Sequence, residues 1–155
     1  MTKYDEPQKP AVGSIDVNVV GGYYTSELAL HYMKDSAAPR AQDQAIEKSL
    51  LFIGSMASYR ALIFATDYSA AKFGVRGMFK ALRGAPGQAW GIRVNMLAPA
   101  YLLTPMTMTR QKSIEELGFE FTDLKVVENA AIRLMGVIEM SGKRIVLPDS
   151  SDVSI

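Results

Sequence analysis

Residues 50–83 read LLFIGSMASYRALIFATDYSAAKFGVRGMFKALR, and this stretch decides the fold. It begins with the wholly apolar run 50–53, which ends at Gly54 and is typical of a short strand buried on both faces. Apolar residues then recur at helical spacing from Tyr68 to Arg83, which predicts an amphipathic helix. The inward positions expected for this helix are Ala71, Val75, Met78, Phe79 and Leu82. A strand followed by such a helix is the unit from which parallel α/β sheets are built.

Downstream of this unit the pattern continues to alternate between strands and helices. The predicted elements are a strand at 92–98, a short helix at 113–117, a helix at 123–135 capped by Asp123 or Thr122, and a strand at 143–147. Pro99 ends the first of these strands. The segment 101–112, rich in threonine and methionine, is expected to be mobile.

Upstream of the unit we expect one long helix, which begins at Ser14 as its N-cap and ends near Met33. Its inner stripe is predicted to consist of Val17, Val20, Tyr24 and Leu28. A polar loop at 34–49 follows it. The alternation of helices and strands predicts an α/β fold with right-handed βαβ units and a parallel sheet. We expect a single domain at 13–148, between a flexible lead at 1–12 and a polar tail at 149–155.

Composition excludes several classes of function for these 155 residues. The net charge of +1 gives no electrostatic attraction for nucleic acid or an anionic membrane. There is no cysteine and one histidine, His31, so disulfides and sites rich in cysteine or histidine are ruled out. No apolar run is long enough to span a membrane, and the polar start is not a signal peptide. We therefore expect a cytoplasmic protein that holds no metal.

Three side chains around the predicted strand and helix point to acid–base chemistry. Tyr68 and Lys72 stand four residues apart, a spacing that places two side chains on one helix face. An ammonium beside a phenol favours the phenolate and lowers the phenol's pKa, so that it can exchange a proton with an alcohol or a ketone. Ser55 follows the strand, at the edge where open α/β sheets build their sites.

The specificity of this pattern comes from the combination of the three residues. Tyr-x-x-x-Lys alone is expected by chance about 0.4 times in this composition, and adding a serine thirteen residues earlier lowers that to roughly 0.03. The structural alternatives are a surface helix pair for Tyr68 and Lys72, and a turn-capping serine for Ser55.

The sequence that contains these residues resembles the short-chain dehydrogenase/reductase family. The resemblance rests on LLFIGSMASYRALIFATDYSAAKFGVRGMFKALRG, on GIRVNMLAPAYLLTPM at 91–106, and on IDVNVVGGYYTSELALHYM at 15–33. Within the family, the sequence is most similar to hydroxyprostaglandin-dehydrogenase-like alcohol dehydrogenases, and it is more loosely similar to alcohol dehydrogenases of secondary metabolism. It implies a partial Rossmann-type, three-layer αβα fold with about three parallel strands, the family's strands 5, 6 and 7.

The resemblance also implies a role for each matching residue. Tyr68 would be the general acid/base, Lys72 would hold the nicotinamide ribose, and Ser55 would orient the substrate oxygen. Asn18 matches the asparagine of the proton relay, although an ordinary mid-helix asparagine is the alternative. The implied contacts to a nicotinamide, from NAD or NADP, are Tyr68, Lys72, Pro99, Leu102 and Thr104. The implied partners are a small alcohol or ketone and, as in the family, further copies of the chain in a homodimer or homotetramer.

The sequence departs from the family in its dinucleotide-binding half. Gly-x-Gly, the turn that lets backbone N–H groups reach a pyrophosphate, occurs nowhere among the twelve glycines. The family's strands 1 to 4 have no counterpart, so strand 5 is expected to be an exposed apolar edge. Two functions remain open: an NAD(P)-dependent dehydrogenase that interconverts a secondary alcohol and a ketone, and a catalytically inactive relative that acts as a dimerising interaction module.

Overall fold

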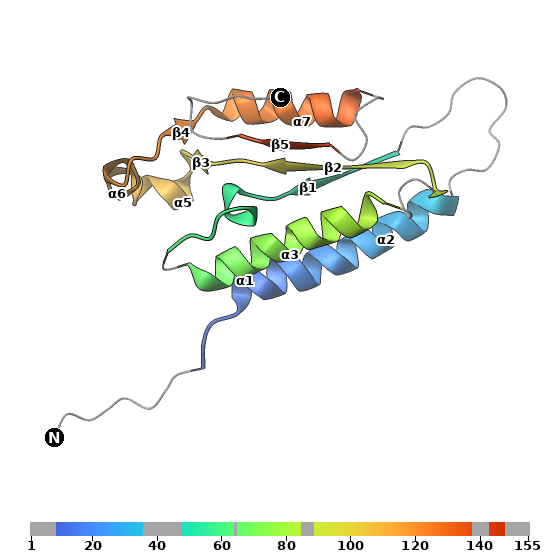
Figure 1. Cartoon of the computed structure of the whole chain (residues 1–155), viewed down its shortest axis with the longest axis horizontal. Coiled ribbons are helices and arrows are strands. Elements are labelled where there is room, and N and C mark those ends of the chain that lie inside the picture. The colour runs from blue at the N-terminus through green and yellow to red at the C-terminus, as the bar shows by residue number, and fades with distance from the viewer. Residues whose placement is uncertain (1–8, 36–47, 64, 85–88, 138–142, 148–155) are drawn as a thin grey trace.

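The computed structural model describes residues 9–35, 48–63, 65–84, 89–137 and 143–147. Three layers are visible in Figure 1: a parallel sheet in the middle, one helix on one face, and two long helices side by side on the other. This arrangement confirms the predicted three-layer α/β class with three parallel strands.

The sheet consists of β1 (Lys48–Ile53), β2 (Ile92–Ala98) and β5 (Arg144–Val146), in the order β1-β2-β5. Both pairs are parallel, with Lys48 opposite Ile92 and Met96 opposite Arg144. β2 is the central strand and is buried almost throughout, which explains its nearly continuous apolar sequence. β1 lies at an edge of this sheet, as expected, and Ile53 at its end is 53% exposed.

One face of the sheet is covered by α3 (Thr66–Leu82) and by a long helix that runs from Gly13 to Asp35. The long helix comprises α1 (Gly13–Ile15), a π-helical turn η1 (Asp16–Gly21) and α2 (Gly22–Asp35). The core on this face joins α2, α3, β1 and β2 through Leu30, Phe52, Val75, Phe79, Ile92, Val94, Met96 and Ala98. The predicted α3 therefore has the correct limits within two residues and the correct inward face.

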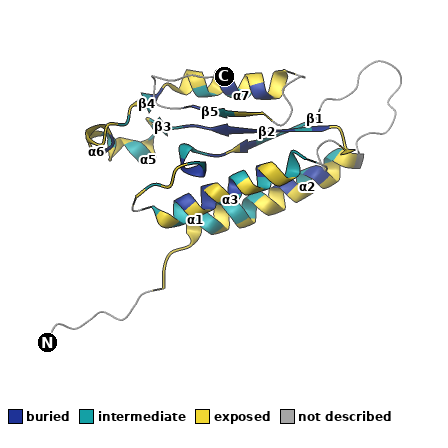
Figure 2. Ribbon diagram, viewed as in Figure 1, coloured by how far each residue is buried: buried dark blue, intermediate teal, exposed yellow. Residues whose placement is uncertain are grey.

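The inner stripe predicted for the long helix is wrong. Val17, Val20, Tyr24 and Leu28 are 73%, 42%, 63% and 58% exposed, whereas Ser26 and Leu30 are buried. Figure 2 shows the contrast between the largely exposed α2 and the buried side of α3. The predicted N-cap is also wrong, because Val12 holds that position and the Ser14 hydroxyl instead bonds the Asp67 carboxylate on α3.

The other face of the sheet is covered by α7 (Leu124–Gly136), which begins after its predicted cap, Asp123. An Asp123 carboxylate oxygen accepts a hydrogen bond from the Lys125 N–H at 2.8 Å. At the other end of α7, the side chain of Asn95 on β2 donates to the Leu134 carbonyl at 2.8 Å and accepts from the Lys143 N–H at 2.9 Å. Asn95 is thus a structural residue that connects three elements.

The segment between β2 and α7 has regular structure, although its part at 101–112 was expected to be mobile, and the short helix predicted at 113–117 is confirmed at 111–116. It contains β3 (Tyr101–Leu102), α5 (Pro105–Met108), α6 (Gln111–Glu116) and β4 (Phe121–Thr122), and β3 pairs with β4 in parallel. Pro105 at the first turn of α5 and a capping box between Thr104 and Thr107 explain why this threonine-rich sequence forms a helix.

Three expectations concern residues outside the described ranges: the lead up to residue 8, most of the loop at 34–49, and the tail after Leu147. Within the described ranges, we find no helix with the length and apolar character that crossing a membrane requires.

Candidate active site

The site begins where β1 ends, at a backbone that lies unusually close to β2. The N–H of Gly54 donates to the Leu97 carbonyl at 2.7 Å, and the N–H of Met56 donates to the Pro99 carbonyl at 2.9 Å. A Cβ on Gly54 would overlap the Met96 side chain and lie 3.0 Å from Ser58 Oγ. Glycine suits this position because any larger residue would have to displace the end of the Met96 side chain and crowd Ser58 Oγ.

Ser55 is positioned by the first turn after β1, the 3₁₀ helix η2 (Met56–Ser58). Its Oγ accepts a hydrogen bond from the Ala57 N–H at 3.1 Å, and Ser58 Oγ accepts from the Ser55 N–H at 3.2 Å. Ser55 is thus the capping serine that the structural alternative required. The same bond occupies a lone pair of the hydroxyl and leaves its O–H able to donate to a reacting oxygen.

Tyr68 and Lys72 lie in the first two turns of α3 and share one face, as their spacing predicts. The Lys72 Nζ is 5.7 Å from the centre of the Tyr68 ring. Lys72 is only 8% exposed, and its Nζ donates to the Ile53 carbonyl, at the end of β1, at 3.2 Å. Burial lowers the pKa of the Lys72 ammonium, because desolvation disfavours its charge. A lysine buried in this way, with two donors left after the bond to Ile53, differs from an ordinary surface lysine.

Ser55 and Tyr68 line the same cavity, which has a volume of about 760 Å³. Its polar lining consists mostly of hydroxyl groups, from Ser55, Tyr68, Tyr101, Thr104, Thr107 and Thr109. The rest is chiefly apolar, with Leu62 and Ile63 from the loop before α3 and Met106 from α5. The loop is attached to α3 by Ser69, whose Oγ accepts from the Leu62 N–H at 3.0 Å. A cavity of this size, with converging polar groups at one part of an apolar wall, is typical of small-molecule sites.

Asn18 does not line this cavity. It lies in the π-helical turn η1, where its side-chain amide donates to the Ser14 carbonyl at 3.0 Å. It lines a second cavity of about 390 Å³, between the long helix and β1, and Ile53 lines that cavity too. Ile53 is also the residue whose carbonyl accepts the hydrogen bond from Lys72 Nζ, so the end of β1 that lines the second cavity is joined to Lys72.

Of the five residues expected to contact a nicotinamide, the three that follow β2 are not equivalent in the structure. Leu102 and Thr104 line the first cavity, together with Ala100, whereas Pro99 is buried and holds η2 through its carbonyl. The Thr104 N–H donates to Thr107 Oγ1 at 2.8 Å, which fixes the turn before α5. Hydroxyl groups, a buried ammonium and a flat apolar wall fit the nicotinamide and ribose of a dinucleotide. The described residues provide no glycine-rich turn for its pyrophosphate.

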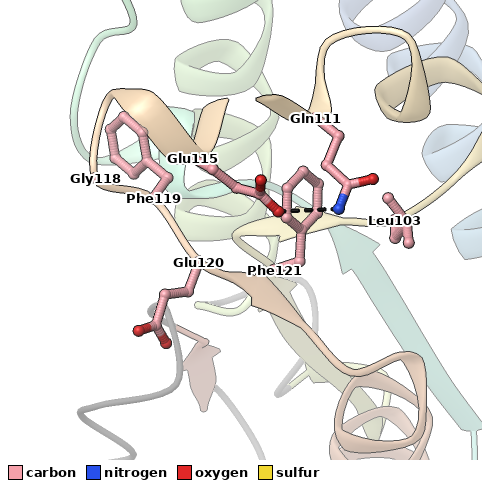
Figure 3. A pocket seen from close by; sticks show the side chains of 7 residues that line it. All are labelled: Leu103, Gln111, Glu115, Gly118, Phe119, Glu120 and Phe121. Atoms are coloured by element: carbon pink, nitrogen blue, oxygen red, sulfur yellow. Dashed lines mark hydrogen bonds between the residues drawn. The ribbon is translucent and has the colours of Figure 1, made fainter. Parts of the chain in front are cut away.

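A separate hollow of about 440 Å³ lies on the outer side of α6 and β4 (Figure 3). Gln111 Nε2 donates to Glu115 Oε1 there at 2.9 Å, while Glu120 points away from that pair. Phe119 and Phe121 line it, and their ring centres lie 5.3 Å and 6.2 Å from that of Tyr101, which lines the first cavity. The aromatic cluster therefore supports the wall between the two cavities.

The lining residues of the first cavity that sequence reasoning did not single out include Tyr101, Met106 and Arg110. These residues are close to Thr104 in the sequence, but closeness in sequence does not predict which side chains point into a cavity. Among the described residues, no group of three or more histidine, cysteine, aspartate or glutamate side chains is arranged to bind a metal ion.

An αβα sheet with a serine at one strand end and a Tyr-x-x-x-Lys helix beside it defines a class, the Rossmann-type oxidoreductases of the short-chain kind. Residues 4–115 match the short chain dehydrogenase family. The chain belongs to that family.

Its similarity to individual proteins is moderate and partial. The chain is 35% identical to the NADP-dependent dehydrogenase clz5 of Cochliobolus lunatus over 81% of its own length and 45% of that protein's. It is 32% identical to the 5'-hydroxyaverantin dehydrogenase stcG of Emericella nidulans, over 89% of its own length and 48% of that protein's. The crystal structure of 3-hydroxyacyl-CoA dehydrogenase type-2 from Mycobacterium avium superposes with a TM-score of 0.73 at 25% identity, over 92% of this chain and 56% of that one. The chain thus spans about half the length of the relatives it matches.

Proposed function

We propose that this chain carries the proton-transfer site of an NAD(P)-dependent dehydrogenase that interconverts a secondary alcohol and a ketone. The observation that carries the proposal is that the hydroxyl-bearing side chains of Ser55 and Tyr68 line one cavity, with the buried ammonium of Lys72 behind the phenol. Family membership and the dehydrogenases among its relatives support the reaction class.

In the direction of reduction, Ser55 and Tyr68 both donate hydrogen bonds to the ketone oxygen. Tyr68 then transfers its proton to that oxygen as negative charge develops there, and the Lys72 ammonium stabilises the phenolate that results. In oxidation the same phenolate takes the proton from the alcohol. A proton relay from Tyr68 toward Asn18 would pass by Lys72, whose Nζ lies 5.7 Å from the centre of the Tyr68 ring and bonds Ile53, a residue that lines the cavity of Asn18.

A nicotinamide dinucleotide, NAD or NADP, supplies or accepts the hydride. Leu102 and Thr104 would line its nicotinamide, and the two remaining donors of the Lys72 ammonium would hold its ribose hydroxyls. The absence of Gly-x-Gly from the sequence means that no such turn of this chain binds the pyrophosphate.

The test is turnover of NADPH or NADH by the purified chain with a panel of apolar ketones, in the wild type and in Tyr68→Phe. Loss of the acid/base should lower kcat by at least about 100-fold, while binding of the dinucleotide, measured by fluorescence titration, stays unchanged. Tyr101→Phe is the matched control, because it removes another phenol from the same cavity and should keep most of the activity. Equal turnover in wild type and Tyr68→Phe would contradict the proposal.

The inactive interaction module receives less support, because Ser55, Tyr68 and Lys72 all remain around one cavity. Self-association as a homodimer or homotetramer is a compatible proposal. The exposed apolar side chains of Val17, Val20, Tyr24 and Leu28 on the long helix, with Phe73 on α3, support it. Sedimentation of the wild type and of Leu28→Glu tests it: the variant should shift to a smaller species, and a monomeric wild type would contradict it.

A further inference from the structure

Arg110 is the one charged side chain, among the described residues, that lines the cavity of Ser55 and Tyr68. It lies in the turn between α5 and α6. Its N–H donates to the Thr107 carbonyl at 2.9 Å, and its carbonyl accepts from the Ile114 N–H at 3.0 Å. The backbone of Arg110 is therefore held on both sides, while its side chain is exposed at the cavity.

The lining of the cavity offers this guanidinium no carboxylate. The acidic side chain of α6 that faces a hollow, Glu115, lines the separate hollow of Figure 3, where it accepts a hydrogen bond from Gln111. A second cation, Lys72, is buried beside Tyr68. The cavity is thus electropositive, with apolar and hydroxyl-bearing walls and no negative group of its own.

We propose that Arg110 binds an acidic group of the substrate. The substrate is then a ketone or secondary alcohol with an apolar body that also carries an anion, such as a carboxylate, away from its reacting carbon. A guanidinium suits this role because its planar donors match the two oxygens of a carboxylate. The inference deepens the proposed function and rests on it, since the reacting carbon is placed by Ser55 and Tyr68.

The anion that Arg110 meets has two possible sources, the substrate and a phosphate of the dinucleotide. The cavity favours the substrate, because Arg110 follows α5 in the chain, whereas Leu102 and Thr104, the residues proposed to line the nicotinamide, precede it. Its neighbours in the lining are Met106, Thr109 and Ile114, a largely apolar group suited to a carbon skeleton.

The test measures binding rather than turnover, so that it can fail independently of the proposed function. The probes are 4-acetylbenzoate and its methyl ester, two aromatic ketones that differ in the anion, titrated calorimetrically into the full chain. We expect the acid to bind about three- to fivefold more tightly than the ester, the range for an exposed ion pair. Arg110→Gln should abolish this preference and Arg110→Lys should keep part of it. Lys112→Gln, which removes an exposed cation outside the cavity lining, should leave it unchanged.

Each other outcome overturns the inference. Equal binding of acid and ester by the wild type, a preference that survives in Arg110→Gln, or binding of neither ketone would each do so. Nicotinamide mononucleotide separates the two sources of the anion: if Arg110→Gln weakens its binding and leaves the ketone preference intact, Arg110 serves the dinucleotide phosphate. The Tyr68→Phe turnover comparison stands apart from all of these results, because it does not depend on the acidic group.

Discussion

The long helix and α3 cover the same face of the sheet, yet they use their apolar residues in opposite ways. α3 turns Ala71, Val75 and Phe79 toward the sheet and buries them. The long helix leaves Val17, Val20, Tyr24 and Leu28 exposed. Helical periodicity identifies a stripe on both helices, but it does not say whether the stripe meets the core of the same chain or another surface.

The reason for the difference is the close approach of the two helices to each other. A Cβ on Gly74 of α3 would lie 2.8 Å from Val19 Cγ2, and a Cβ on Gly22 would lie 3.3 Å from Met78 Cε. Small residues at this contact bring the helices together and leave little room for large apolar side chains between them. The inward side of α2 therefore carries Ser26, and Leu30 is its buried large residue.

The largest expected effect is on α3, from Phe79→Ala. Phe79 is 1% exposed within the core between the helices and the sheet, so its truncation should lower the free energy of unfolding by about 3–5 kcal/mol. Phe73→Ala, on the same helix but at a position 43% exposed, should cost less than about 1.5 kcal/mol. Urea unfolding followed by circular dichroism measures both, and similar losses for the two variants would contradict the assigned orientation of α3.

On α2 the matched pair is Leu30→Ala and Leu28→Ala, two identical substitutions two positions apart. Leu30 is 3% exposed and belongs to the core, so its loss should cost about 2–4 kcal/mol. Leu28 is 58% exposed, and its loss should cost roughly 0.5 kcal/mol in the monomer. The measurement is made at low protein concentration, so that self-association does not add to the result. A larger loss of unfolding free energy for Leu28→Ala than for Leu30→Ala would mean that the inner stripe predicted from the sequence is the correct one.

The fold was predictable from sequence wherever a pattern had one physical solution. The central strand at 92–98 is apolar on both faces, and Pro99 ends it, so its limits were fixed by burial and by the missing N–H. Between β2 and α7 the short helix α6 was predicted close to its observed place, whereas β3, α5 and β4 were not predicted. Their structure depends on contacts such as the Thr104–Thr107 capping box and the rings of Tyr101, Phe119 and Phe121.

The candidate site divides in the same way. Ser55, Tyr68 and Lys72 come from one strand–helix unit, so their spacing in the sequence was enough to predict that they lie close together. Asn18 comes from a separate helix, and nothing in its spacing could show that it faces a second cavity. Arg110 is brought to the site by two short helices whose packing is a tertiary property, so no sequence pattern distinguishes it from the other exposed cations.

Alanine substitutions at two glycines of α3 test the contact between the two helices, with smaller expected effects on stability. Gly74→Ala should lower the free energy of unfolding by about 1–2 kcal/mol, because its Cβ meets the stiff side chain of Val19. Gly77→Ala should raise it by up to about 1 kcal/mol, because nothing lies within 4 Å of the new Cβ and alanine favours a helix. Thermal unfolding of both variants gives the signs. Stabilisation by Gly74→Ala would mean that the long helix does not lie against α3 at this point.

The smallest expected effect concerns the interaction of Ser14, on the long helix, with the Asp67 carboxylate on α3. The Ser14 hydroxyl, and then the Tyr68 N–H, hydrogen-bond the Asp67 carboxylate and hold its pKa below the ordinary value. A carboxyl whose pKa is lowered in the folded state contributes stability above its unfolded pKa, and this contribution disappears as the pH falls through the folded pKa. Asp67→Asn should therefore be slightly less stable than the wild type near pH 6, and the difference should vanish toward about pH 3. Ser14→Ala should reproduce most of the loss at pH 6. If the difference between Asp67→Asn and the wild type is the same at both pH values, the carboxylate does not join the long helix to α3.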